Sequence, residues 1–326
     1  MEHAEGRTVP VRRENPGSGG RTRSFWRKFA LDLKRDKSLY LLALPGVVFF
    51  LIFKYVPMWG VVIAFQNYSP FGGVLHSPWV GLEHFRRFFQ TEDFWSLLRN
   101  TLGINVLSLV FFFPVPIVVS LMLNELRNAV YKRIVQSVIY LPHFLSWVII
   151  AGLTFALFAK GEGLVNHLLE AAGLERIDVL TNPDTFWIMV TVQSMWKEAG
   201  WGTIVFLAAI AGADPQVYEA ARMDGAGRFR QMWHVTLPAI RSVIVILLIL
   251  RLGHIMDVGF EQIFLMYNGA VSQVAEVFDT YVYRTGIQRA EFSYSTAVGL
   301  FKSVVGLVLV LLANRAAKKL GEDGVF

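Results

Sequence analysis

Six long apolar stretches constrain what this chain can fold into. Each is about as long as the roughly 20 residues that a helix needs to cross a lipid bilayer. The stretches are residues 39–65, 101–123, 137–158, 186–212, 237–256 and 294–313. Apolar residues make up 54% of the chain and charged residues only 17%, against roughly 45–50% and about 25% in soluble domains. The sequence therefore predicts an all-α integral membrane protein with six transmembrane helices.

The segment before the first apolar stretch is basic. Ten of residues 1–38 are Lys or Arg, and this segment contains Gly and Pro but no apolar run. Such a composition buries too little apolar surface to fold. We therefore predict a basic flexible cytoplasmic tail at residues 1–38 and a six-helix membrane domain at residues 39–326, with a cytoplasmic loop at residues 213–236.

The distribution of basic residues predicts the orientation in the membrane. With six spans both termini lie on one side, and the basic tail places that side in the cytosol. The other segments expected inside carry nine Lys or Arg in 50 residues, whereas those expected outside carry seven in 99. The inside segments are 124–136, 213–236 and 314–326, and the outside segments are 67–100, 159–185 and 257–294. Both termini are therefore expected to be cytoplasmic.

Composition also excludes several kinds of chemistry. Cysteine is absent, which rules out disulfides, thiolate metal sites and cysteine nucleophiles. The seven His residues show no ligand-like spacing, so we expect neither a metal site nor a cofactor bound by this chain. The net charge of +6 comes from basic residues at membrane edges rather than from one clustered basic face, which argues against a nucleic acid partner.

Charged residues also occur inside the predicted spans. They are Lys54, Lys197, Glu198, Arg251 and Lys302. A charge that faces lipid at the centre of a helix costs about 2.5–3.5 kcal/mol, so each must face protein, water or the membrane edge. We expect Lys54 and Lys302 to extend toward the interface. The other three lie deeper, where they either line a transport pathway or form a structural ion pair.

The fourth apolar stretch carries a polar and aromatic stripe. The stripe consists of Gln193, Trp196, Lys197, Gly200 and Trp201. Intervals of three and four residues place these side chains on one face of a helix. Indole rings stack on the apolar faces of sugars, while an amide and a cation bind hydroxyls or a carboxylate. We expect this face, together with Arg251, to line a substrate pathway; the alternative is a packed interface between helices.

Prolines interrupt two of the predicted helices. Pro114 and Pro116 lie in the second stretch and Pro142 in the third. A proline inside a helix removes a hydrogen bond and kinks or breaks the helix. Broken helices at the middle of the membrane are typical of transport sites.

The segment between the fourth and fifth stretches predicts a helix, a turn and a second helix. Asp214 is a good N-cap and Pro215 suits the first helical position. Gly225 ends this helix, since glycine adopts the left-handed backbone that other residues resist. An amphipathic segment then reaches the membrane at residues 237–238. On composition alone the hairpin could lie on lipid headgroups, but the small residues 220–221 fit the groove of a partner protein better.

This loop carries a recognisable motif. It reads Glu-Ala-Ala-x-x-Asp-Gly-Ala and is followed eleven residues later by Leu-Pro. The matching positions are Glu219, Ala220, Ala221, Asp224, Gly225, Ala226, Leu237 and Pro238. The pattern resembles the EAA motif of permease subunits in bacterial binding-protein-dependent ABC importers. In that family the loop forms a coupling helix that docks into a cleft of the ATPase subunit. The resemblance implies a type I ABC importer permease fold and assigns ATPase coupling to the first six of these residues.

The amino-terminal half carries a second resemblance. Its residues are Leu-Pro-Gly at 44–46, Phe-Lys-Tyr-Val-Pro-Met-Trp-Gly at 53–60, Ala-Phe-Gln-Asn-Tyr at 64–68 and Ser-Pro-Trp-Val-Gly-Leu-Glu-His-Phe at 77–85. These segments are similar to the MalF-like sugar permeases. Within them, they are similar to the branch that imports fragments of acidic polysaccharides such as polygalacturonate and alginate. The two resemblances together cover residues 39–320.

The resemblance implies one subunit of a larger importer. The chain lacks the Gly-x-x-x-x-Gly-Lys-Ser/Thr phosphate loop, so we do not expect an enzyme, and a separate pair of ATPase subunits would bind ATP and magnesium. The other implied partners are a second, related permease chain in a heterodimer, a soluble solute-binding protein and an oligosaccharide that contains uronate units. The implied location is the bacterial cytoplasmic (inner) membrane.

Other functions remain open on the sequence alone. Within the ABC class, the cargo could be a neutral sugar or another small solute such as glycerol phosphate. An ion-coupled secondary transporter would show repeated halves and intramembrane carboxylates, but only Glu198 lies well inside a predicted span. An intramembrane enzyme would need facing catalytic groups, whereas His143 and His254 lie on different stretches. A scaffold that merely binds an ATPase is a further alternative.

Overall fold

The computed structural model describes residues 35–319, 321 and 324, so most of the predicted tail at 1–38 lies outside the described residues. The chain divides into two compact units, Met1–Gly60 and Val61–Phe326. In the first unit the described residues from 37 onward form one continuous run of helix. Its parts are α2 (Lys37–Phe50), a π-helical turn η1 (Leu51–Tyr55) and α3 (Val56–Met58), and a 3₁₀ segment η2 (Trp59–Phe65) leads into the second unit.

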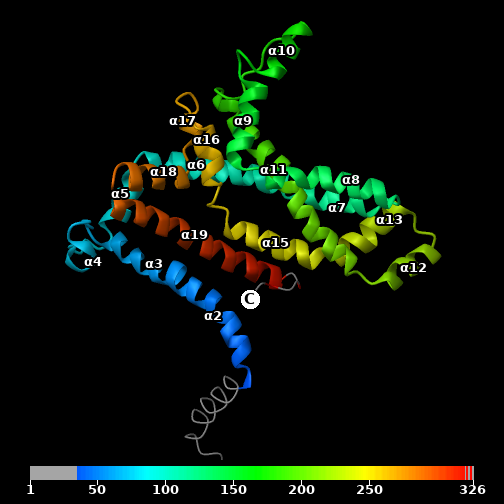
Figure 1. Ribbon diagram of the computed structural model, residues 1–326, viewed down its shortest axis with the longest axis horizontal. Coiled ribbons are helices and arrows are strands. Elements are labelled where there is room, and N and C mark those ends of the chain that lie inside the picture. Colours follow the sequence, from blue (N-terminus) through cyan, green and yellow to red (C-terminus); the bar gives the residue numbers. More distant parts are fainter. Residues whose placement is uncertain (1–34, 320, 322–323, 325–326) are drawn as a thin grey trace, which may run out of the picture. The chain divides into compact units, whose positions relative to one another are not determined.

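The second unit is built from helices of very different lengths (Figure 1). The longest are α11 (Pro183–Ala211) and α19 (Phe292–Lys319). The others, in chain order, are α4 (Gly73–His76), α5 (Glu83–Gln90), α6 (Asp93–Leu107), η3 (Ser108–Phe112), α7 (Pro114–Asn124), α8 (Ala129–Tyr140), η4 (Leu141–Phe144), α9 (Trp147–Phe158), α10 (Leu164–Ala171), α12 (Pro215–Met223), α13 (Arg228–Gln231), η5 (Met232–Thr236), α14 (Leu237–Ala239), α15 (Arg241–Gly253), α16 (Phe260–Met266), α17 (Ser272–Ala275), α18 (Phe278–Tyr283) and η6 (Arg284–Gln288). Within the described residues the only extended pairing is a single bridge between Gln66 and Trp79. The all-α fold class is confirmed.

Among the described residues, three helical segments are long and apolar enough to cross a membrane. They are Lys37–Phe65, Asp93–Asn124 and Phe292–Lys319. Two more qualify if each bent pair of helices counts as one span. The pairs are Ala129–Phe144 with Trp147–Phe158, bent by 101°, and Arg228–Ala239 with Arg241–Gly253, bent by 58°. These five segments overlap five of the six predicted stretches. The remaining stretch forms α11, whose 29 residues are long enough to span but are interrupted by charged side chains.

Proline accounts for several of the helix irregularities. It has no N–H to donate, and its ring clashes with the carbonyl four residues earlier, so the hydrogen-bond ladder shifts in the preceding turn. Pro114 follows the π-helical turn η3, Pro238 lies just after η5, and Pro142 lies in the 3₁₀ turn η4. Ser146 then caps α9 by accepting a hydrogen bond from the Ile149 N–H at 3.3 Å. The disruptions expected near Pro114 and Pro142 are therefore present.

Helix α11 occupies a central position in the second unit. It packs against α6, α7 and α8 (Figure 1), and its residues Phe186, Met189 and Val190 belong to a buried apolar cluster shared with α16 and α17. Gly200 allows a very close approach to α8, because a Cβ at this position would lie 2.3 Å from the Ile139 carbonyl oxygen. The predicted stripe of α11 therefore lies where several helices meet.

Candidate functional site

The motif loop, residues 213–236, starts as the sequence predicts. Helix α12 begins at Pro215, and the Asp214 side chain accepts a hydrogen bond from the Gln216 N–H at 2.9 Å. The N-cap carboxylate satisfies one of the backbone donors that a helix leaves unpaired at its start. The helix is therefore fixed at its first turn by its own sequence.

The turn after α12 is closed by a glycine in the left-handed conformation. Gly225 has a φ of +72°. The Ala226 N–H donates to the Ala221 carbonyl at 2.9 Å, and the Gly225 N–H donates to the Arg222 carbonyl at 3.0 Å. This pair of hydrogen bonds is the Schellman pattern, which satisfies the last carbonyls of a helix. The predicted helix, turn and helix are confirmed, with α13 following the turn.

The motif residues are open to a partner, and the loop is braced by a bond between its two ends. Of the six residues that the resemblance assigns to coupling, Glu219, Ala220, Asp224 and Gly225 are exposed and Ala221 and Ala226 are half-buried. The Tyr218 hydroxyl donates to the Thr236 hydroxyl at 3.1 Å, which joins α12 to η5 at the end of the loop. The loop therefore presents its motif on a surface that its own sequence holds together.

Lys197 lies at the break between η4 and α9. Its Nζ donates to the carbonyls of His143 and Leu145, each at 2.7 Å, and lies 5.5 Å from the centre of the Trp147 ring. The side chain is buried. These carbonyls are exposed by the bend of the third span, and a buried carbonyl without a partner is costly. Lys197 therefore stabilises the broken helix from α11.

Gln193 belongs to a buried amide network. Its Nε2 donates to the Thr154 hydroxyl at 2.7 Å, and its Oε1 accepts from Gln262 Nε2 at 3.0 Å. Gln262 also donates to the Val190 carbonyl at 2.7 Å. The network joins α9, α11 and α16. Both polar ends of Gln193 are used within the chain, and the network keeps three helices in register.

The two tryptophans of the stripe are half exposed, at 49% for Trp196 and 52% for Trp201. The Trp201 ring stacks on the His143 ring, with 4.8 Å between the centroids and 10° between the planes. His143 Nδ1 lies 2.8 Å from Glu198 Oε2, so the carboxylate orients the imidazole. His143 is thus not the isolated residue that its sequence position suggested.

The structure does not bring the expected pathway residues together on one open surface. Trp196 and Trp201 are exposed, Gln193 and Lys197 are buried, and Arg251 is half-buried on α15. The Arg251 guanidinium lies 5.8 Å from the centre of the Phe112 ring. The shared face predicted from spacing is real along the helix, but neighbouring helices cover part of it.

Lys302 makes ion pairs that the sequence did not predict. It contacts the carboxylates of both Asp257 and Asp279, and its side chain is 16% exposed. The interaction joins α19 to α18 and to the segment after α15. The two carboxylates pair with the Lys302 ammonium group. This pairing is needed because an isolated buried charge is costly.

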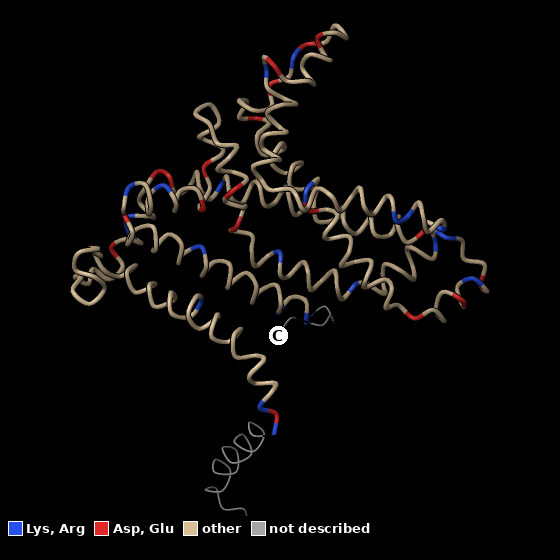
Figure 2. Tube along the Cα trace, viewed as in Figure 1, with Lys and Arg blue, Asp and Glu red and all other residues tan. Residues whose placement is uncertain are grey.

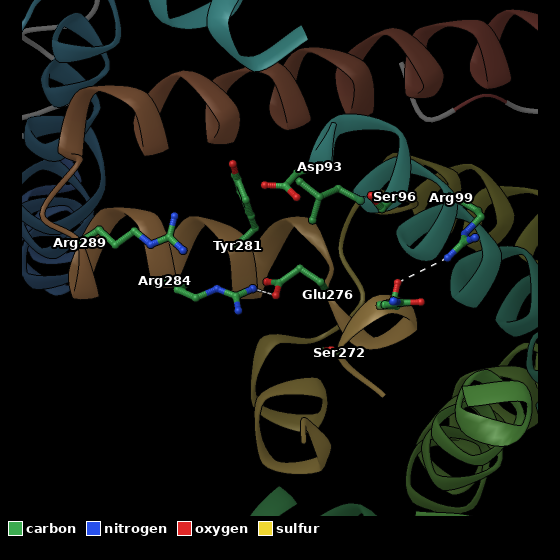
Figure 3. Close-up of a pocket in the computed structure, with 10 residues that line it drawn as sticks. Asp93, Ser96, Arg99, Ser272, Glu276, Tyr281, Arg284 and Arg289 are labelled. Atoms are coloured by element: carbon green, nitrogen blue, oxygen red, sulfur yellow. Dashed lines mark hydrogen bonds and ion pairs between the residues drawn. The ribbon is translucent and has the colours of Figure 1, made fainter. Parts of the chain in front are cut away.

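A polar cavity of about 470 Å³ lies between α6 and the α17–η6 segment (Figure 3). Arg99, Arg284 and Arg289 line it together with Glu276. Arg284 is ion-paired with Glu276, and Arg99 donates to the Gln273 carbonyl at 3.4 Å. The charges of this cavity are therefore partly neutralised within the chain. The cavity lies at the end of the second unit away from α12 and α13 (Figure 1).

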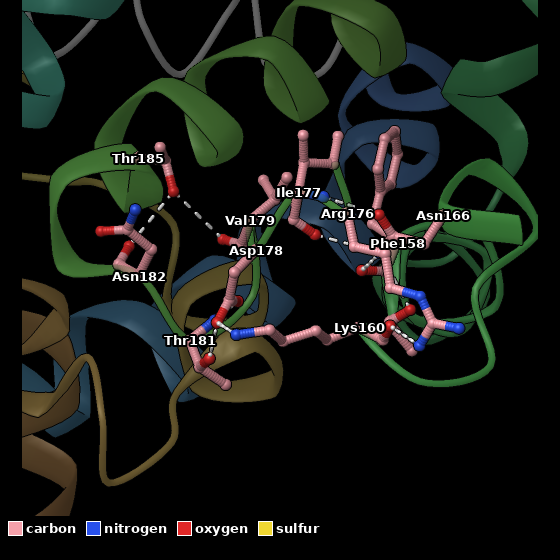
Figure 4. Close-up of polar contacts among 11 residues, drawn as sticks. Phe158, Lys160, Asn166, Arg176, Ile177, Asp178, Val179, Thr181, Asn182 and Thr185 are labelled. Atoms are coloured by element: carbon pink, nitrogen blue, oxygen red, sulfur yellow. Dashed lines mark hydrogen bonds and ion pairs between the residues drawn. The ribbon is translucent and has the colours of Figure 1, made fainter. Parts of the chain in front are cut away.

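The segment after α9 extends away from the other helices of the second unit (Figure 1). It is held by local polar contacts (Figure 4). Asn166 donates to the carbonyls of Ala159 and Ile177 at 3.1 and 3.0 Å, and its Oδ1 accepts from the Ile177 N–H at 2.8 Å. The Thr181 hydroxyl and N–H donate to Asp178 at 2.6 and 3.0 Å. These bonds lower the pKa of the Asp178 carboxyl below its usual value.

The family comparison decides the identity of the fold. Residues 113–322 match the family described as the binding-protein-dependent transport system inner membrane component. The chain belongs to this family. The permease is 55% identical over 300 residues to the polygalacturonan/rhamnogalacturonan transport system permease protein YteP of Bacillus subtilis, covering 92% of this chain and 94% of that protein. It is also 54% identical over 319 residues to protein LplB of the same organism, covering 98% and 99%.

A solved structure resembles the permease along most of its length. It is described as the crystal structure of a bacterial alginate ABC transporter in complex with an alginate pentasaccharide-bound periplasmic protein. The matched chain is 43% identical, with a TM-score of 0.82, and the match covers 90% of this chain and 98% of that one. The all-α ABC permease fold is confirmed, as is the assignment to sugar permeases.

Several buried polar residues of the permease carry no sequence signal of their own. Gln262 bonds to a residue 72 positions away and Asn166 to one eleven positions away, yet neither belongs to a recognisable motif. Only the polar character of Gln262 and Asn166 within apolar surroundings could have marked them as network members.

In the part of the chain that the structure describes, no group of three His, Asp or Glu residues could hold a metal ion.

Proposed function

We propose that this permease forms half of the translocation pathway of an ATP-dependent importer in the bacterial cytoplasmic membrane. A second, related permease chain supplies the other half in a heterodimer. The observation that carries the proposal is the exposed motif loop, whose Schellman turn presents Glu219 and Ala220 while Tyr218 bonds to Thr236 at the end of the loop. Membership of the binding-protein-dependent family supports an importer over an ion-coupled secondary transporter.

The proposed cargo is an oligosaccharide that contains uronate units, such as a fragment of pectin or alginate. Two observations support it: the 55% identity to a polygalacturonan/rhamnogalacturonan permease and the fold shared with an alginate transporter. A soluble solute-binding protein delivers the cargo, as the family description implies. Trp196 and Trp201 are the best placed residues to stack on sugar rings, because their indoles are half exposed.

The permease crosses the membrane six times, with both termini in the cytoplasm. Helix α11 is added to the five candidate spans and brings the number of crossings to six. Its 29 residues exceed the roughly 20 needed to span. Its charged residues Lys197 and Glu198 face other protein groups, which removes the main objection to placing α11 in lipid. The excess of Lys and Arg in the segments assigned to the inside supports the orientation.

A pair of ATPase subunits binds ATP and magnesium and drives the transport cycle through the motif loop. Helix α11 leads directly into the loop, and the loop ends in η5, after which α14 and α15 follow. A rigid-body movement of α12 in an ATPase cleft is therefore transmitted to two helices of the bundle. Glu219 can pair with a basic residue of the cleft, and Ala220 permits close approach.

Reconstitution tests the proposal directly. Proteoliposomes that contain both permease chains, the ATPase and the binding protein should accumulate labelled oligogalacturonate or alginate oligomers when ATP is supplied. Vesicles without the ATPase are the control and should accumulate none. Uptake that proceeds without the ATPase, or that follows an imposed ion gradient, would contradict the proposal.

One observation favours a neutral oligosaccharide as a second candidate cargo. The Lys197 ammonium already donates to two carbonyls, and Lys302 is paired with two carboxylates, so neither is free to bind a uronate. Competition in the same vesicles separates the two candidates. An excess of unlabelled neutral oligosaccharide should leave uptake of the labelled uronate unchanged if the cargo is acidic.

A further inference from the structure

A cavity of about 800 Å³ separates the end of α7 from the motif loop. We call it the loop cavity. Its polar lining consists of Asn124, Glu125, Arg127, Tyr218, Arg222, Arg228 and Gln231. Its size lies within the range of about 300–1,000 Å³ that is usual for small-molecule sites. The cavity is independent of the expected substrate pathway, whose residues lie elsewhere on α11 and α15.

The loop cavity has a strong excess of positive charge. Three arginines line it, and Glu125 is its single carboxylate. In the described chain, Arg127, Arg222 and Arg228 make no hydrogen bond or ion pair with another side chain. Figure 2 shows basic residues gathered where α12 and α13 meet the end of α7. This differs from the cavity near α6, where Arg284 is already paired with Glu276. Unpaired guanidinium groups that converge on a cavity are suited to a phosphate or carboxylate.

The surroundings of the loop cavity place it at a membrane edge. The segment Asp93–Asn124, which is apolar enough to span, ends at its rim, and the bent pair that begins with α13 starts there. Phe229 and Trp233, one helical turn apart, are 75% and 57% exposed, and Val130 beside Arg127 is also exposed. Large aromatic residues next to arginines are typical of the zone where headgroups meet acyl chains.

The geometry points to the loop cavity as a binding site for the phosphate headgroup of an anionic phospholipid. The arginines bind the phosphate, and the exposed apolar residues beside them contact the acyl chains. Basic pockets between the helices of membrane proteins bind such headgroups. A free phosphate ion would use the arginines but would gain nothing from Phe229 and Trp233.

The site leaves the coupling residues of α12 free, since Ala226, beyond the end of α12, is the one coupling residue among those that line the cavity. Tyr218 and Arg222, four residues apart, both line the cavity. Ala220 follows Tyr218 by two residues, about 200° around the helix, and therefore faces away from the cavity. A lipid on one face and an ATPase on the other can be bound at the same time. The headgroup then joins the motif loop to the end of α7 and restricts its movement relative to the second span.

The test measures lipid retention by the assembled importer. The full complex is purified in detergent with an equal mixture of phosphatidylglycerol and phosphatidylcholine, and native mass spectrometry identifies the lipids that stay bound. Phosphatidylglycerol should be retained in preference. Since each basic residue near an anionic headgroup contributes a factor of about five, the double variant R127Q/R228Q should lower this retention about 25-fold. The variant R315Q removes an exposed arginine near the end of α19 that does not line the cavity, and it should retain lipid like the wild type.

Three further measurements keep the test decisive. The variant R127K/R228K keeps the charges and should retain most of the lipid, which separates loss of charge from misfolding. Displacement of the lipid by millimolar inorganic phosphate would overturn the proposal in favour of a free-anion site. Unchanged lipid retention in R127Q/R228Q together with loss of the ATPase would also overturn it, because the arginines would then bind an acidic residue of the ATPase. Retention needs no transport, so a failure of oligosaccharide uptake would bear only on the proposed function.

Discussion

The motif loop and the polar stripe of α11 use hydrogen bonds over very different distances along the chain. The bonds that shape the end of α12 join residues at most five positions apart, such as Ala226 to Ala221. The bonds of the stripe join Lys197 to His143, 54 positions away, and Gln193 to Gln262, 69 positions away. The loop is therefore shaped by its own sequence, whereas the stripe is shaped by the helices around it.

This difference determines what each region has available for function. In the loop, backbone groups close the turn and the Asp214 and Tyr218 side chains brace it, while motif side chains such as Glu219 remain exposed for a partner. In the stripe, the polar side chains themselves make the structural bonds, so Lys197 and Gln193 are already satisfied before a ligand arrives. Changes in the loop should therefore alter coupling, while changes in the stripe should first alter stability.

The largest expected effect is on the turn of the motif loop. Replacing Gly225 by Val places a β-branched residue at a φ of +72°, which costs of order 1–3 kcal/mol and reorients α12 relative to α13. We expect ATP-dependent uptake to fall by at least about tenfold, while the protein still inserts into the membrane. Uptake by reconstituted vesicles is the measurement.

Asparagine is the matched control at this position, because it tolerates the left-handed conformation better than valine. The variant G225N should keep a substantial part of the uptake. Normal uptake by G225V would show that the local turn does not govern coupling, and the contrast between the two regions would lose its functional meaning.

The next effect separates a structural from a transport role for Lys197. The variant K197M leaves the carbonyls of His143 and Leu145 without their partner, at about 1–3 kcal/mol for each buried group. We expect a clearly lowered melting temperature of the purified permease. K318M, at an exposed lysine, is the control and should melt like the wild type. A K197M protein with unchanged melting but a raised KM for sugar would instead assign Lys197 to the pathway.

A smaller effect is expected from the amide network, where partners can be removed together. The variant Q193L removes one of the two acceptors of the Gln262 amide nitrogen and should cost about 1–3 kcal/mol. Removing both amides in Q193L/Q262L should cost less than the sum of the single changes, because no stranded donor or acceptor remains between them. Thermal unfolding of the three variants measures this. Strictly additive losses would mean that the two amides act independently.

The range of these bonds also explains how much the sequence could predict. Apolar length predicted five of the candidate spans, and Asp214, Pro215 and Gly225 predicted the helix and turn of the loop, because each signal acts within a few residues. The destination of Lys302 could not be predicted, since Asp257 and Asp279 approach it only through tertiary packing. Pro142 predicted a break in the third span, which the structure shows as a 101° bend after Phe144. The sequence did not predict that Lys197 of α11 stabilises this bend. Residues 1–34 lie outside the described part of the chain.

The smallest expected effect is a pH dependence of the stability of a second exposed segment, residues 159–182. It tests whether local hydrogen bonds hold this segment as they hold the motif loop. The Asp178 carboxyl accepts from Thr181 twice, and its pKa lies below its ordinary value of 3.8. The folded segment therefore binds this proton less readily than the unfolded one. The resulting stability is complete above the ordinary value and is lost as the pH falls through the lowered pKa.

Pepsin cleavage within 159–182 should accordingly increase as the pH is lowered from about 5 to about 2, relative to cleavage of an unstructured peptide of the same sequence. The variant D178N cannot ionise, so its relative cleavage should not follow the pH in this way. E175Q, at an exposed residue of the same segment, should behave like the wild type. If the wild type shows no pH dependence, then Asn166, which joins residues 159 and 177, is sufficient to hold the segment. The extension would then still be shaped within its own sequence, as the motif loop is, because Asn166 bonds to residues only seven and eleven positions away.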